Sequence, residues 1–164
     1  MIYLEVIKQK IYSTESISRQ ISTWRLFNKK IVFTNGCFDL LHQGHIDYLT
    51  KAKDLADFLI VGVNSDSSVK KLNKGENRPI QNENSRALII ASLHFVDAVL
   101  LFREDTPLEL ITLIQPDVLV KGGDWKPDQI IGADAVKAKG GEVRVIPFLE
   151  RFSTTGIENK ILNK

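Results

Sequence analysis

The sequence has little cysteine and no long apolar run. Cys37 is the only cysteine among 164 residues, so no disulfide can form within the chain, and a reducing compartment such as the cytoplasm is the simplest expectation. No stretch of roughly 18 apolar residues occurs, which excludes a membrane-spanning helix of the usual kind. The first residues carry scattered charges and lack the apolar centre of a signal peptide. These absences predict a cytoplasmic protein that does not insert into a membrane.

An excess of one charge is also missing. Lys and Arg number 22 against 20 Asp and Glu, which gives a formal net charge of +2. Nucleic acids and anionic membranes usually require a concentrated basic field, so neither is predicted as a partner. The hydrophobic share of 43% and the charged share of 26% are ordinary for a globular protein. The length suits a single domain with a sizeable core.

Apolar runs typical of buried strands alternate along the chain with segments of helical periodicity. Strands are predicted over 31–34, 58–66, 98–102, 117–121 and 142–148. Helices are predicted over 44–55, 85–95, 107–115, 130–140 and 155–162, with a long polar loop over 67–85. The first 28 residues form an amphipathic helical lead-in, whose apolar face carries Ile17, Ile21 and Trp24.

Repeated strand–helix alternation builds right-handed βαβ units around a parallel sheet. The predicted fold is therefore α/β, a Rossmann-like doubly wound parallel sheet of about five strands with helices on both faces, in a single domain. We expect a helical N-terminal extension over 1–28 and the sheet domain over 29–164. Ligands of such sheets bind at the carboxyl ends of the strands.

Polar clusters stand where four of the predicted strands end. They cover 34–36, 64–66, 121–124 and 152–155, and they combine glycines, hydroxyls and the positive charge of Lys121. The same edge of the sheet should bring them together, which suits a phosphate-rich small molecule. The two common phosphate loops, GxxxxGK[ST] and GxGxxG, are absent. Another phosphate-binding device must therefore operate.

That device is predicted in His42-Gln43-Gly44-His45, at the start of a helix. Residues three apart share one helix face. Free N–H groups and the positive end of the helix dipole favour anions there, and two imidazoles can donate to phosphate oxygens. Gly44 allows close approach. The arrangement suits phosphoryl or nucleotidyl transfer, in which positioning and charge stabilisation dominate.

Structural roles compete with each functional one. Ser153–Thr155 and Asp66 could be helix caps, and Lys121–Asp124 a strand-ending turn. A zinc site would need a fourth ligand beside the candidate side chains of Cys37, His42 and His45. Residues for which packing or solvation is an alternative role are Cys37, Lys74, Arg86, His94 and Trp125.

The motif HQGH after NGCFD resembles the HxGH signature of the nucleotidyltransferase superfamily, and Ser153–Thr155 resembles its second signature. More specifically, eight segments in order resemble the adenylyltransferases that act on D-glycero-β-D-manno-heptose 1-phosphate: FTNGCFDLLHQGH, IVGVNSD, RPI, DTPLELI, PDVLVKGGDW, IIGADAV, GGEVRVIPF and FSTT. The resemblance covers about 29–162. In many bacteria this activity is the second domain of a bifunctional kinase and adenylyltransferase. No kinase portion is present here, so a stand-alone counterpart is expected.

The resemblance implies transfer of AMP from ATP to the sugar phosphate, giving ADP-heptose and pyrophosphate. Mg²⁺ on the nucleotide phosphates is implied, with no metal ligand assigned to the protein. The implied catalytic residues are His42, His45 and Lys121. The implied nucleotide-binding residues are Asn35, Gly36, Phe38, Gly44, Arg86, Gly122, Ser153, Thr154 and Thr155. The implied substrate-binding residues are Asp39, Asp66, Lys74 and Trp125. The resemblance also suggests a homodimer.

The sequence departs from the family pattern at three places. The KKLNKG segment over 70–75 is about one residue longer than usual, Arg151 replaces a common glycine, and Gly156 replaces a common serine. Two other functions therefore stay open. One is a CTP-dependent nucleotidyltransferase for another small phosphate such as glycerol 3-phosphate, against which Lys121 argues, because related glycerol-phosphate cytidylyltransferases lack it. The other is a catalytically silent nucleotide-binding module.

Overall fold

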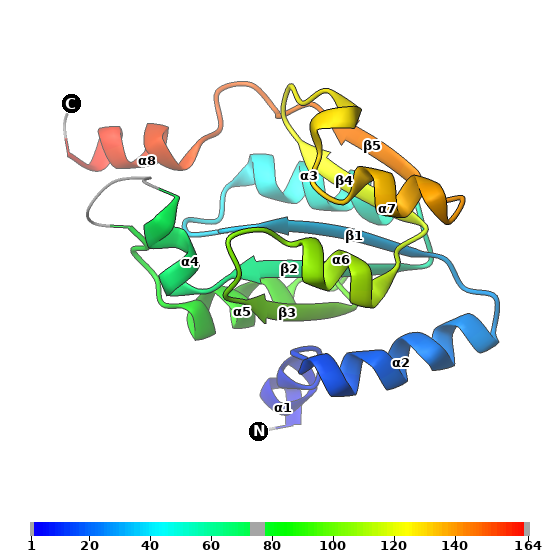
Figure 1. Ribbon diagram of the computed structural model, residues 1–164. Helices are drawn as coiled ribbons and strands as arrows, with labels where there is room; N and C mark the ends of the chain where they lie inside the picture. Colours follow the sequence, from blue (N-terminus) through cyan, green and yellow to red (C-terminus); the bar gives the residue numbers. More distant parts are fainter. Residues whose placement is uncertain (1, 73–77, 163–164) are drawn as a thin grey trace.

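The computed structural model describes residues 2–72 and 78–162. Five strands form one parallel sheet in the order β3-β2-β1-β4-β5 (Figure 1). This arrangement confirms the predicted fold class. The strands are β1 (Ile31–Gly36), β2 (Phe58–Asn64), β3 (Ala98–Phe102), β4 (Val118–Gly122) and β5 (Glu142–Ile146).

The helices are α1 (Ile2–Lys8), α2 (Thr14–Leu26), α3 (Gln43–Lys53), α4 (Asp66–Lys71), α5 (Glu83–Ser92), α6 (Leu108–Ile114), α7 (Ala133–Ala138) and α8 (Thr154–Ile161), with a short 3₁₀ helix η1 (Pro127–Gln129). Within the described ranges, no helix has the length and apolar character needed to cross a membrane.

The predicted loop over 67–85 is wrong at its start, because α4 occupies that stretch. The Ser65 hydroxyl caps this helix by accepting from the Ser68 N–H at 3.2 Å, and Asp66 places a negative charge at its positive end. The predicted helix over 130–140 is too long. Gly132 adopts φ +86 in front of α7, a left-handed conformation that favours glycine and marks the true helix start.

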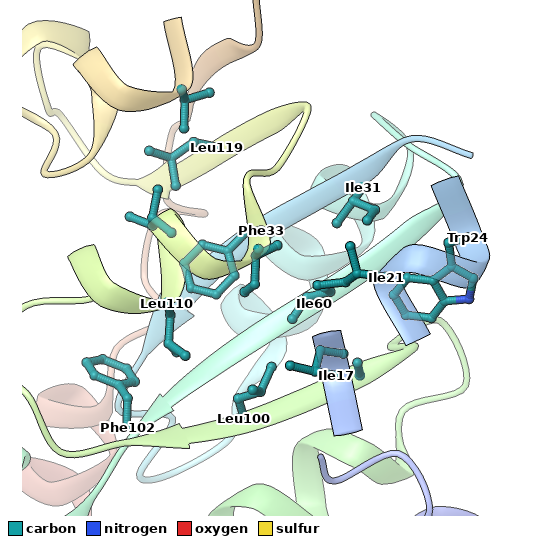
Figure 2. Packing of buried hydrophobic residues seen from close by; sticks show 14 of the residues in the cluster. Ile17, Ile21, Trp24, Ile31, Phe33, Ile60, Leu100, Phe102, Leu110 and Leu119 are labelled. Carbon is teal, nitrogen blue, oxygen red and sulfur yellow. The ribbon is translucent and has the colours of Figure 1, made fainter. Parts of the chain in front are cut away.

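Successive side chains of each strand point to opposite faces of the sheet, and both faces are buried in apolar clusters. Figure 2 shows one face, on which Ile31 and Phe33 of β1 pack with Ile60 of β2. Helices α2, α6 and α7 cover this face, while α3 and α5 cover the other. The sheet is thus doubly wound, as predicted.

The N-terminal extension is part of this packing. Ile17, Ile21 and Trp24 of α2 are buried in the core, as predicted, and the Trp24 ring stacks on Phe58 with centroids 4.1 Å apart (Figure 2). Ile11 forms a parallel bridge with Val99, which covers part of the outer edge of β3. The domain boundary at residue 28 stays a prediction.

The strand order reverses beside β1. Strands β2 and β3 follow on one side of β1, and the chain then crosses to β4 and β5 on its other side. The loops that leave the carboxyl ends of β1 and β4 therefore diverge, which opens a crevice between them. Figure 1 shows α8 and α4 at this end of the sheet, toward which the strand arrows point.

Candidate active site

A cavity of about 800 Å³ lies at the carboxyl ends of the strands, where the strand order reverses. It is lined by the ends of β1, β2 and β4, by α3, and by the first residues of α8. Of the residues predicted from the sequence, those that line it are Asn35, Gly36, Phe38, Asp39, His45, Lys121, Gly122, Trp125, Thr154 and Thr155. Lys74 lies outside the described residues.

The starts of α3 and α8 meet at this cavity. His42 is the N-cap residue of α3 and Ser153 that of α8, and the Ser153 hydroxyl accepts from the Gly156 N–H at 3.0 Å. A Cβ atom added to Gly44 would lie 3.2 Å from Cβ of Phe152, so the two helix starts are in close contact. His45 and the pair Thr154 and Thr155 come from distant parts of the sequence and line one cavity. Each helix N-terminus favours an anion there.

The two imidazoles stack on each other. The ring centroids of His42 and His45 are 3.8 Å apart with an interplanar angle of 19°, and the edge of His45 faces Phe38 at 5.3 Å. Nδ1 of His42 is buried and has no hydrogen-bond partner in the part of the chain that the structure describes. Burial lowers the pKa of His42 below its usual 6.5. The ring is therefore mainly neutral at pH 7 in the free protein, and a polyanion beside it would favour its charged form.

We expect proton uptake when a polyphosphate ligand binds, because phosphate charge beside His42 raises a pKa that burial lowers in the free protein. The bound state holds more protons than the free state, so affinity should rise as the pH falls through the pKa of His42 in the bound state toward its lowered pKa in the free protein, by up to about tenfold per pH unit for one linked proton. Titration calorimetry in buffers of different ionisation enthalpy measures this uptake. His42→Gln should abolish it, and a wild-type protein that takes up no proton would contradict the expectation.

The turn after β1 is held in an unusual conformation. Phe38 adopts φ +49, in the left-handed region that side chains rarely occupy, and its ring is almost fully buried. A Cβ atom on Gly36 would lie 3.0 Å from that ring, so a side chain at this position would push the Phe38 ring out of place. Strain of this kind is concentrated at functional sites. Phe38 thereby forms a wall of the cavity against His45.

Lys121 supplies positive charge at the crevice. Its Nζ donates to Oδ1 of Asn35 across the β1–β4 pair at 3.2 Å. Beside it, a Cβ atom on Gly122 would approach Cε1 of Phe148 to 2.5 Å, so Gly122 allows the Phe148 ring to close over the strand end. The predicted pair Asn35 and Lys121 is thus adjacent in the structure.

Asp39 lines the cavity, but its carboxylate is already engaged. One oxygen accepts from the N–H groups of Ile80 and Gln81 at 2.9 Å each, and the other accepts from Arg78 Nη1 at 3.1 Å. These contacts hold the segment 78–81 against the turn after β1. The predicted substrate contact of Asp39 stays a prediction, and its visible role is to position this segment.

Arg86 and Asp66 are not brought to the cavity. Arg86 is 0% exposed, and its guanidinium donates to Cys37 O at 2.6 Å, Gln81 O at 3.0 Å and Asp66 Oδ1 at 2.8 Å. A direct nucleotide contact by Arg86, as predicted from the sequence, does not fit this position, because all of these bonds would have to break. The same pairing occupies the Asp66 carboxylate. Arg86 instead braces the loop that carries Phe38.

Sequence reasoning missed several cavity residues, among them Arg78, Tyr48, Phe148 and Gln129. The sequence contained a signal for two of these residues. Arg78 stands in the RPI segment, and Tyr48 follows His45 by one helical turn. Burial raises the pKa of Tyr48, whose hydroxyl bonds to Thr34 and Val120, so this side chain is a structural donor. Phe148 and Gln129 carry no local pattern that predicts a cavity.

The described residues contain no group of three or more His, Cys, Asp or Glu side chains that could hold a metal ion. The carboxylates of Asp39 and Asp66 are paired with Arg78 and Arg86.

A model of the family described as cytidylyltransferase-like matches residues 33–161. The chain belongs to the cytidylyltransferase-like family. The match spans both helix starts at the cavity, and it begins only after the segment that holds α1 and α2.

Sequence relatives support the same family. The chain is 50% identical over 155 residues to "Bifunctional protein HldE" of Trichlorobacter lovleyi, covering 94% of this chain and 31% of the relative. It is 53% identical over 154 residues to the protein of the same name from Campylobacter concisus, with the same two coverages, 94% and 31%. The chain thus spans about a third of the length of these relatives.

Solved structures agree on the cytidylyltransferase-like fold. A lipopolysaccharide core biosynthesis protein from Thermoplasma volcanium GSS1 is similar with a TM-score of 0.61 and 31% identity, over 76% of this chain and 99% of that one. A pantoate-beta-alanine ligase from Francisella tularensis, complexed with an ATP ligand and beta-alanine, has a TM-score of 0.54 at 19% identity, over 94% of this chain and 78% of that one. The second likeness supports the fold alone.

Proposed function

We propose that the protein is an adenylyltransferase that transfers AMP from ATP to D-glycero-β-D-manno-heptose 1-phosphate, giving ADP-heptose and pyrophosphate. The observation that carries the proposal is the meeting of His45 with Thr154 and Thr155 at one cavity, between two helix N-termini. This arrangement suits a nucleoside triphosphate, whose charges lie along a chain of phosphates.

The relatives favour this substrate pair. About half of the residues are identical to proteins named as bifunctional HldE, and a structural neighbour is titled a lipopolysaccharide core biosynthesis protein. The sequence segments that resemble heptose 1-phosphate adenylyltransferases include all three cavity residues that carry the proposal. The family match alone would equally allow a CTP-dependent enzyme.

The reaction needs one displacement at phosphorus. An oxygen of the sugar phosphate attacks the α-phosphorus of ATP and the bond to the β-phosphate oxygen breaks, so that pyrophosphate carries away the negative charge. Groups that hold this charge more strongly in the transition state accelerate the step. His42 and His45 donate to the phosphates from the start of α3, and Thr154 and Thr155 donate from the start of α8. A divalent cation bound to the nucleotide phosphates would shield part of their negative charge.

The rest of the cavity would hold the nucleoside and the acceptor. Lys121 lines the cavity beside Asn35, where a positive charge can draw the sugar phosphate toward the α-phosphorus. The exposed rings of Trp125 and Phe148 line the apolar part of the cavity and offer surfaces for a base or a sugar. Gly36 and Gly122 leave room at the strand ends for the rings of Phe38 and Phe148.

The test is pyrophosphate release from purified protein with each nucleoside triphosphate and each acceptor. ATP with heptose 1-phosphate and Mg²⁺ should give the highest kcat/KM. Faster release with CTP and glycerol 3-phosphate would contradict the proposal and favour a CTP-dependent nucleotidyltransferase for another small phosphate. Measurable ATP binding without release, whatever the acceptor, would favour a silent nucleotide-binding module. A homodimer and a cytoplasmic location stay predictions.

A further inference from the structure

Helix α8 delivers two hydroxyls to the cavity and has little apolar anchorage of its own. None of its residues is buried, and Ile161 and the adjoining Leu162 are mostly exposed. The other helices that border the cavity or cover the sheet, such as α3 and α5, hold their place with buried apolar side chains. Some other contact must therefore fix the direction of α8.

An arginine from a distant loop supplies such a contact. Arg78 Nη2 lies 2.6 Å from Glu158 Oε2 in the middle of α8, while Nη1 of the same guanidinium lies 3.1 Å from Asp39 Oδ2. The Arg78 side chain is only 10% exposed, and that of Glu158 is 28% exposed. A pair that is this far removed from solvent is screened less than a surface pair, so it holds its geometry more firmly.

At its other end, Arg78 is bonded to an Asp39 carboxylate that is itself firmly held. Asp39 is 4% exposed, and it also accepts from the Ile80 and Gln81 N–H groups, while Gln81 Nε2 donates to the Asp39 carbonyl at 2.8 Å. Arg78 is thus fixed to the loop between β1 and α3, the same loop that leads to the two imidazoles. The chain Asp39–Arg78–Glu158 connects the start of α3 with α8.

We propose that Arg78 is a positioning residue, which holds α8 through Glu158 so that Thr154 and Thr155 face the nucleotide phosphates beside His45. The inference rests on the proposed function and deepens it. The ion pairs of Arg78 with Asp39 and Glu158 would align the two helix starts that bind the phosphates. Arg78 itself lines the cavity, so nucleotide binding and the position of α8 are coupled through its guanidinium.

Glu158→Ala tests the proposal, because it removes one partner and leaves Arg78 bonded to Asp39. A negative charge near a triphosphate repels it, so simple electrostatics predicts that losing Glu158 tightens nucleotide binding. The proposal predicts the opposite. Affinity for α,β-methylene-ATP should weaken about tenfold, and KM for ATP should rise by a similar factor, with a smaller fall in kcat. Glu158→Gln keeps an acceptor oxygen, so its affinity for the analogue should lie between those of the wild type and Glu158→Ala.

Lys160→Ala is the matched control, since Lys160 is an exposed residue of the same helix, and its affinity should equal that of the wild type. Amide hydrogen exchange of α8 in the free protein provides a second readout, which should be faster in Glu158→Ala and unchanged in Lys160→Ala. Unchanged or tighter analogue binding by Glu158→Ala would overturn the proposal. A wild type that binds the analogue but uses no heptose 1-phosphate would contradict the proposed function alone, because neither readout needs the acceptor.

Discussion

His42→Ala and His45→Ala are each expected to lower kcat by about 10²–10³, which corresponds to roughly 3–4 kcal/mol of transition-state stabilisation. Both imidazoles stand at the start of α3 and stack with ring centroids 3.8 Å apart, and His45 lines the cavity. Donors fixed in advance against developing charge lose no energy in reorganisation, so removing one costs more in rate than in ground-state binding. KM for ATP should change much less than kcat. Steady-state pyrophosphate release measures both.

The third histidine provides the control. His94 follows α5, contacts Phe95, and is not among the residues that line the cavity. His94→Ala should keep kcat within about twofold of the wild type, because exposed or half-buried positions away from a site rarely affect rate. A fall of less than about threefold in either His42→Ala or His45→Ala, with the fold intact by circular dichroism, would remove that residue from the mechanism.

Arg86→Ala should lower the free energy of unfolding by about 3–5 kcal/mol. The guanidinium is 0% exposed, and its loss removes one hydrogen bond from each of the Cys37 and Gln81 carbonyls and opens a cavity beneath the loop. Denaturant unfolding monitored by tryptophan fluorescence gives the difference. Replacement by lysine should recover only part of it, because an ammonium cannot reach three acceptors in a planar arrangement.

Arg144→Ala is the matched control for this second prediction. Arg144 pairs with Glu142 at 2.7 Å on the edge strand β5, and the two side chains are 58% and 59% exposed. Exposed pairs contribute little, so this change should cost less than about 1 kcal/mol. Arg86→Ala with a cost as small as that of Arg144→Ala would show that Arg86 does not stabilise the loop that carries Phe38.

The strands and the start of α3 could be predicted from the sequence, because local residue patterns determine them. A continuous apolar run such as 58–63 suits only a strand that is buried on both faces, and His42-Gln43-Gly44-His45 has a spacing that a helix face explains. The alternation of such runs with helices then determines the parallel sheet and the end at which ligands bind. Placing Thr154 at the same cavity as His45 followed from that topology.

The partners of charged side chains could not be predicted, because they depend on which loops meet in space. Nothing in the local sequence distinguishes Arg86 from an exposed arginine on a helix. It is buried because the loop that carries Phe38 lies over it and accepts its hydrogen bond through Cys37 O. Arg78 is separated by 80 positions from its partner Glu158, and no periodicity links them. The helix α4 was missed for a local reason: its six residues are mostly polar, and its stability depends on the Ser65 cap and on the burial of Val69.

The central claim is that the start of α3 and the start of α8 hold the same triphosphate. A crystal structure with α,β-methylene-ATP and Mg²⁺ tests it most directly. The claim predicts phosphate oxygens within about 2.7–3.2 Å of an imidazole nitrogen of His42 or His45 and, in the same molecule of ligand, of the hydroxyl of Thr154 or Thr155. A bound triphosphate that contacts one helix start and leaves the other empty would contradict it.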